Sequence, residues 1–150
     1  MRRRPLNLEL RADEAEGSLA TMKILILIVR ILLGLIFVVF GLNGFLHFLP
    51  MGPMPAPDSP AGMFFAAVSK SGYMQVVFAC QVLAGLLLLV NFWPVLGLAI
   101  LCPIVFNIVL FHVTMAPSGL PLAIVVTVLS LFLVWAYWDH YRHLLRQPNQ

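Results

Sequence analysis

Long apolar stretches, separated by short polar or proline-rich segments, dominate this chain. The first stretch runs from Ile24 to Leu42 and holds 19 residues, of which only Arg30 is charged. Between Lys70 and Asp139 lie 68 consecutive residues without Asp, Glu, Lys or Arg. Because a helix needs about 20 mainly apolar residues to cross a bilayer, this pattern predicts an integral membrane protein with several transmembrane helices.

Breaks in the apolar pattern divide the chain into four spans and one short helix. Five prolines between residues 50 and 60 exclude a regular helix or strand from the first connection. Ser59 and Pro60 are typical of a helix start, and Gly72 is typical of a helix end. We therefore predict spans over residues 23–47, 73–91, 95–112 and 120–138, with a short amphipathic helix over residues 60–71 between the first two.

The short connections between the spans predict that consecutive spans lie antiparallel. The expected fold is all-α, a membrane-embedded antiparallel four-helix bundle over residues 23–145. Residues 1–22 are expected to form a polar cytoplasmic tail, either disordered or a short surface helix, and residues 146–150 a C-terminal tail. Because Met22 directly precedes the first span, we also expect residues 1–21 to be dispensable.

The charge distribution indicates how the spans are oriented. The chain is 61% hydrophobic, only 10% charged, and carries a formal net charge of +3. Four spans bring both termini to one side, where most basic residues lie, while the other side holds only Lys70. The positive-inside rule therefore predicts that both termini are cytoplasmic. The basic residues on that side are Arg2, Arg3, Arg4, Arg11, Lys23, Arg142 and Arg146, and the aromatic belt expected there comprises Trp93, Trp135, Tyr137 and Trp138. We interpret the N-terminal arginines as a topology signal, so no nucleic-acid partner is expected.

Arg30 is the first candidate for a function, because an arginine in mid-membrane is costly and usually turns inward. Helical spacing places it on one face with small residues, which mark helix–helix contacts, so we expect its side chain to point into the bundle. That face comprises Arg30, Gly34, Phe37, Gly41 and Gly44. Arg30 is then either a structural cation, paired with Asp139 or with lipid headgroups, or a contact to an anionic or quinone-like ligand.

Polar residues in the outer half of the spans are the second group of candidates. Polar groups in hydrocarbon need hydrogen-bond partners, so these side chains are expected to meet inside the bundle. They form either interhelical hydrogen bonds that stabilise the fold or a wet pocket, open to the outside and lined by His47 and His112. Together the predicted ligand-binding residues are Arg30, Asn43, His47, Gln81, Asn107 and His112.

Two histidines on different spans are an arrangement that binds b-type haem, but we do not expect haem here. Asn107 and His112 are five residues apart, and a straight helix would not aim both inward. A metal ion is not expected either, because no acidic or thiolate ligand lies near these histidines. Cys80 and Cys102 lie at different depths and are expected to pack as small apolar residues.

Several segments together resemble the DoxX family of small four-span bacterial membrane proteins. The matching segments are RILLGLIFVVFGLNGFLHFLP, QVLAGLLLL, LGLAILCPIVFNIVLFH and WAYWDHYRHLL. The resemblance implies the four-span fold and a place in the bacterial cytoplasmic (inner) membrane. Some members are described as quinone-linked oxidoreductase subunits and others are tied to redox-stress complexes, so the resemblance also implies quinone as the candidate cofactor.

Three functions remain open on the sequence. The first is a quinone-linked membrane redox subunit, with other redox subunits or a second copy of the chain as partners. The second is a non-enzymatic partner or chaperone subunit that stabilises another membrane protein. The third is a small transporter, against which stands the lack of an Asp or Glu for proton coupling in any span.

Overall fold

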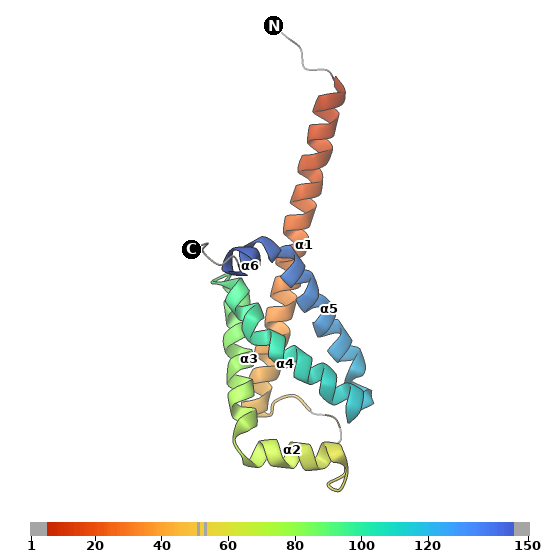
Figure 1. Cartoon of the computed structure of the whole chain (residues 1–150), viewed down its shortest axis with the longest axis vertical. Coiled ribbons are helices and arrows are strands. Elements are labelled where there is room, and N and C mark those ends of the chain that lie inside the picture. Colours follow the sequence, from red (N-terminus) through yellow and green to blue (C-terminus); the bar gives the residue numbers. More distant parts are fainter. Residues whose placement is uncertain (1–5, 51, 53, 146–150) are drawn as a thin grey trace.

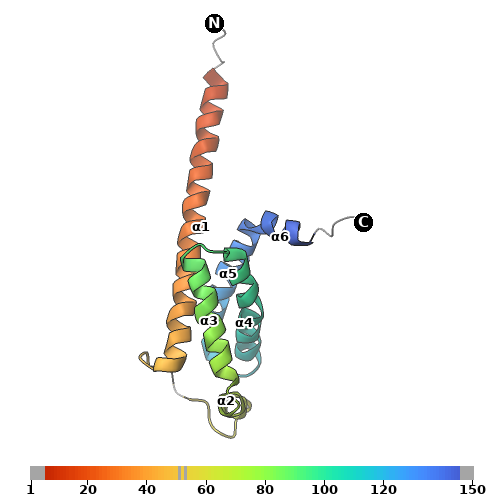
Figure 2. The same ribbon diagram turned by 90° about the vertical axis from the view of Figure 1, so that its left-hand side faces the viewer.

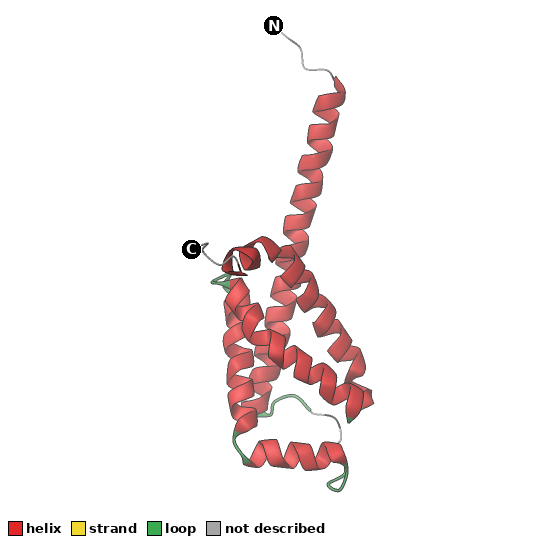
Figure 3. Ribbon diagram, viewed as in Figure 1, coloured by secondary structure: helices red, strands yellow, loops and turns green. Residues whose placement is uncertain are grey.

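Helices account for all the regular structure in the described part of the chain. The computed structural model describes residues 6–50, 52 and 54–145, and among these it contains no strand (Figures 1 and 3). The elements are α1 (Leu6–Leu46), α2 (Pro60–Lys70), α3 (Tyr73–Leu89), α4 (Pro94–Thr114), the 3₁₀ turn η1 (Pro117–Gly119), α5 (Leu120–Ala136) and α6 (Trp138–Leu145). The all-α fold class is therefore confirmed.

Three segments of the described chain are long and apolar enough to cross a membrane. They are the Asp13–Leu46 part of α1, the whole of α4, and the Pro117–Ala136 segment formed by η1 and α5. The pair α2 and α3 passes the same test as a broken span, with an angle of 81° between its two helices. Only 33%, 28% and 17% of the most apolar windows of the first three segments are buried, so most of their surface is available to lipid. The chain is thus compatible with a multi-pass membrane protein.

The first helix starts much earlier than the predicted position near Lys23. Helix α1 begins at Leu6 and runs without a break to Leu46, so the described part of the expected disordered tail is helical. Leu, Ala, Glu and Arg have high helix propensity, and in this segment they continue a helix that the apolar span has already nucleated. The first half of α1 projects beyond the other helices (Figures 1 and 2).

The short helix α2 begins at the predicted residue Pro60, ends at Lys70, one residue before the predicted end, and has the predicted caps. The Ser59 hydroxyl oxygen accepts a hydrogen bond from the backbone N–H of Gly62 at 3.1 Å, which caps the N-terminus of α2. Gly72 follows its C-terminus with a φ of +76°, a left-handed conformation that glycine adopts without strain. The sharp angle between α2 and α3 is built at this residue.

The last predicted span does not continue straight into the charged C-terminal segment. Helix α5 ends at Ala136, and α6 begins at Trp138 and points away from it (Figure 2). Asp139, His140 and Arg142 make α6 polar on one side. Helix α6 therefore does not continue along the axis of the apolar helix α5. The Tyr141 hydroxyl donates a hydrogen bond to the backbone oxygen of Val95 at 3.0 Å and attaches α6 to the start of α4.

Helix α1 packs against α3 and α5, and α4 packs between α3 and α5. Helices α1 and α3 approach each other closely at two glycines. A Cβ atom added to Gly34 would lie 3.0 Å from the backbone oxygen of Gly85, and one added to Gly85 would lie 2.8 Å from that of Gly34. The predicted small-residue face of α1 is therefore a helix contact. The buried apolar core around it comprises Val29, Leu33, Phe37, Ala84, Leu88, Leu98, Leu101, Val105, Val126 and Leu133.

Candidate functional site

Arg30 lies on the packed face of α1, as its helical spacing predicts. Its side chain is buried, with 8% of its surface exposed. In the described chain its Nε is the one buried side-chain nitrogen or oxygen without a hydrogen-bond partner. A buried donor that is not satisfied is costly, so Arg30 is the residue here that most needs an acceptor from outside the chain.

The glycine contacts show which part of α3 lies level with Arg30 of α1. A Cβ atom added to Gly41 would meet Val82, and one added to Gly34 would meet Leu89 at the end of α3. Arg30 lies one further turn beyond Gly34, which places it level with the C-terminus of α3. The carbonyls at a helix C-terminus carry partial negative charge, and they stabilise a nearby cation without neutralising it.

The expected ion pair between Arg30 and Asp139 does not form. The Asp139 side chain is 86% exposed, and its Oδ1 lies 3.6 Å from Nη1 of Arg142 on the same helix. The physical reason is the break at Tyr137, because α6 turns away from α5 and carries the carboxylate into solvent.

Asn43 is buried and makes a local hydrogen-bonded link. Its Oδ1 accepts a hydrogen bond from the backbone N–H of Leu49 at 2.6 Å, and its Nδ2 donates to the Leu49 oxygen at 3.4 Å. Only 1% of the residue is exposed. The side chain thus holds the segment that follows α1 against the end of that helix.

His47 lies just beyond the end of α1 and is exposed. Its φ of +52° turns the chain out of the helix, and its backbone N–H donates to the Asn43 oxygen at 2.9 Å. Within the described chain, its ring makes no hydrogen bond and no ring contact with His112. The structure therefore places this histidine on the surface and not inside the group of helices.

His112 is half-buried near the end of α4 and closes the turn that follows. Its Nδ1 lies 2.8 Å from the backbone oxygen of Ala116. A carbonyl can only accept, so Nδ1 carries the proton of this bond. The ring sits where a side chain on Gly119 would be, and it packs edge-on against Phe111.

Gln81 faces a neighbouring helix, whereas Asn107 lies on the exposed face of its own helix. Gln81 is 8% exposed and packs on α1 beside Gly41. Asn107 is exposed, and its Nδ2 donates to the backbone oxygen of Pro103 in its own helix at 2.9 Å. The interhelical meeting predicted for these amides is therefore not seen at Asn107.

The cavity between α4 and α5 is not lined by the six predicted residues. A cavity of about 130 Å³ lies between α4 and α5, and its lining residues are Val109, Leu120, Ala123, Ile124, Thr127 and Val128. None of the six is among them. Within residues 6–50, 52 and 54–145, no three His, Cys, Asp or Glu side chains are grouped so that they could hold a metal ion. A role of these six residues in ligand binding stays a prediction.

Tyr141 is a structured polar residue that the sequence did not single out. Besides its bond to Val95, it packs on the apolar core. Burial, and then the nearby Cys102, raise the pKa of its phenol above the ordinary value of 10.0. The three-residue spacing of Trp138 and Tyr141 was the available signal, since it gives α6 one apolar side.

No family model, curated protein or solved structure matches this chain. The similarity to the DoxX family therefore rests on the sequence motifs alone and stays a prediction.

Proposed function

We propose that this chain is a four-span protein of DoxX type in a bacterial inner membrane, and that it serves as a non-enzymatic partner subunit for another protein. In this proposal α1, the α2–α3 pair, α4 and α5 form an antiparallel bundle. Both termini are cytoplasmic, because α6 lies at the end of the packed helices from which α1 projects (Figures 1 and 2). Exposed Trp93, Trp135 and Trp138 near that end suit the membrane interface.

The projecting part of α1 carries the proposal of a partner role. Every residue from Asp13 to Leu25 is exposed. Gly17 has no atom of the rest of the chain within 4 Å of an added Cβ. A helix without tertiary contacts is only marginally stable in water, because most helical stability comes from packing. A projecting helix of this length is therefore well suited to lie against a second protein.

The charge of this segment indicates the chemistry of the partner. Between residues 6 and 25, four acidic residues stand against two basic ones, and Leu19 is 62% exposed. The acidic residues are Glu9, Asp13, Glu14 and Glu16, and the basic residues are Arg11 and Lys23. Complementary charge steers association and selects partners. The expected partner surface therefore combines basic residues with an apolar groove that accepts one face of a helix.

A photo-crosslinking amino acid at position 19 tests the partner role in cells. With the crosslinker at position 19, we expect a crosslinked product with one second protein. Val128, which is 58% exposed on α5, is the matched control, and a crosslinker there should react with lipid and with no protein. The same protein crosslinked at both positions, or no protein at Leu19, would contradict the proposal.

The quinone-linked redox role implied by the resemblance stays an alternative. One observation favours it, because a quinone carbonyl could accept a hydrogen bond from the buried Arg30 guanidinium. An absorption spectrum and a lipid extract of the detergent-purified protein decide this point. One quinone per chain, lost in Arg30→Gln, would support the redox role over the partner role.

A further inference from the structure

We propose that Arg30 and Lys23 together bind the phosphate of an anionic phospholipid at the end of the packed helices from which α1 projects. This inference goes beyond the proposed partner role and does not depend on it. The buried Nε of Arg30 has no hydrogen-bond partner within the described chain.

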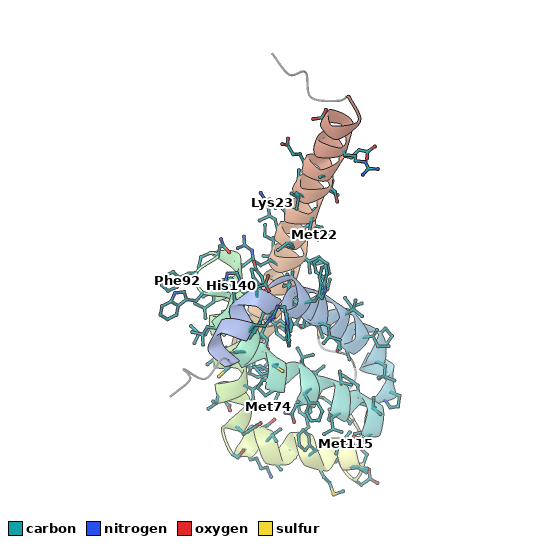
Figure 4. The ribbon with its side chains drawn as sticks, turned by 45° about the horizontal axis from the view of Figure 1, so that its top comes forward. Met22, Lys23, Met74, Phe92, Met115 and His140 are labelled. Carbon is teal, nitrogen blue, oxygen red and sulfur yellow. The ribbon has the colours of Figure 1, made fainter. Side chains whose placement is uncertain are left out.

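Helical geometry places the two cations on the same face of α1. Lys23 and Arg30 are seven residues apart, which is nearly two full turns and about 10 Å along the axis. Side chains lean toward the N-terminus of their helix, so the Arg30 guanidinium extends toward Lys23. Lys23 is exposed on the projecting part of α1, at the same end as His140 of α6 (Figure 4). A phosphate between them can accept hydrogen bonds from both.

The charges around this face leave it positive. The ion pair found in the described residues joins Asp139 to Arg142 and involves neither cation. Glu16 is the nearest acid on the same face, about 10 Å beyond Lys23. The last carbonyls of α3, from Leu86 to Leu88, already accept from the backbone N–H groups of the following turn. Within the described chain, neither cation therefore has a carboxylate within 4 Å that an anionic group would have to displace.

An anionic phospholipid fits these surroundings better than a neutral quinone. A quinone carbonyl would leave the buried charge of Arg30 uncompensated, whereas a phosphate neutralises it. Arg30 also lies at the border of the packed face, with buried Leu33 on one side and exposed Leu27 and Ile31 on the other. An acyl chain can lie over Leu27 and Ile31, and basic sites between helices at the cytoplasmic end are typical of such lipids.

Native mass spectrometry of the full chain in mild detergent tests the site. The probes are phosphatidylglycerol and phosphatidylcholine with identical acyl chains. We expect the wild type to prefer phosphatidylglycerol by at least about tenfold, and Arg30→Gln to lose this preference. Lys23→Gln should weaken phosphatidylglycerol binding about fivefold, as for one basic residue near the surface. Lys70→Gln, an exposed lysine on α2, is the matched control and should leave binding unchanged.

Two further arms keep the proposal falsifiable. If Arg30→Gln does not fold, as judged by size exclusion, Arg30→Lys should keep the preference for phosphatidylglycerol with weaker binding, and exposed Lys23 still tests the site. An excess of inorganic phosphate should not displace the lipid, because the acyl chains add to its binding. Equal binding of the two lipids, equal effects of Lys23→Gln and Lys70→Gln, displacement by inorganic phosphate, or a quinone in place of the phospholipid would overturn the proposal.

Discussion

Asn43 and Asn107 show at the scale of single residues how the surroundings decide the role of a side chain. Both are asparagines in apolar helices, and the sequence predicts that both meet other polar side chains inside the bundle. Asn43 is buried and bonds the backbone of Leu49, whereas Asn107 is exposed and bonds its own helix. Helical spacing alone could not separate them, because it does not say which face of a helix is covered.

The two asparagines make a matched pair of variants. We expect Asn43→Ala to lower the free energy of unfolding by about 1–3 kcal/mol, because it removes the acceptor of the Leu49 N–H. Asn107→Ala should change it by less than about 0.5 kcal/mol, as for an exposed residue. Unfolding in mixed detergent micelles measures both. Equal losses in the two variants would contradict the structural role assigned to Asn43.

Tyr141 predicts a pH dependence at the same scale. Burial raises the pKa of its phenol in the folded state, and the neighbouring Cys102 adds to this, while α6 lies outside the candidate spans. Because the folded-state pKa exceeds the unfolded value, the contribution of the neutral phenol to stability is complete below about pH 10 and is lost as the pH rises through the folded-state pKa.

An absorbance titration of the phenolate checks this shift. The chain has three tyrosines, and we expect one of them to ionise later than in the unfolded protein. Tyr141→Phe should remove that late component. Loss of a component at the ordinary pKa in this variant would show that the phenol is not protected by the fold.

At the scale of elements, the contact between α1 and α3 depends on Gly34 and Gly85. An alanine at position 85 would bring a Cβ to 2.8 Å from the Gly34 backbone oxygen. We expect Gly85→Ala to cost about 1–3 kcal/mol through overpacking, although alanine is the better helix former.

Gly17→Ala is the control for this substitution, because an added Cβ there meets no atom within 4 Å. It should leave the unfolding of the packed helices unchanged and raise the helical content of the projecting segment. Thermal unfolding in detergent, followed by circular dichroism, compares the two variants. A Gly85→Ala protein as stable as the Gly17→Ala protein would rule out the close approach of the two helices.

For the molecule as a whole, the proposed orientation in the membrane rests on the charge distribution and on α6 lying at the end from which α1 projects (Figure 1). We expect reporter tags at the N-terminus and at the C-terminus to be cytoplasmic, and a tag in the segment after Pro50 to be on the other side. A variant that begins at Met22 should still insert in this orientation, because the first apolar span is intact, although it should lose the crosslinked partner. Tags on opposite sides for the two termini would refute a four-span arrangement.

The apolar stretches, the proline-rich connection and the caps at Ser59 and Gly72 were sufficient to predict an all-helical membrane chain and the bounds of α2, because they act through neighbouring residues. The inward direction of Arg30 also followed from helical spacing. The helical extension from Leu6, the turn at Tyr137 that separates Asp139 from Arg30, and the scattering of the polar candidates did not. Those features depend on how helices that are far apart in the chain end and pack, and a periodic pattern carries no information about which distant group lies opposite a given face. The sequence by itself therefore predicted lipid surroundings and determined the helical segments of this protein. The partners of its buried polar groups were decided only by the tertiary structure.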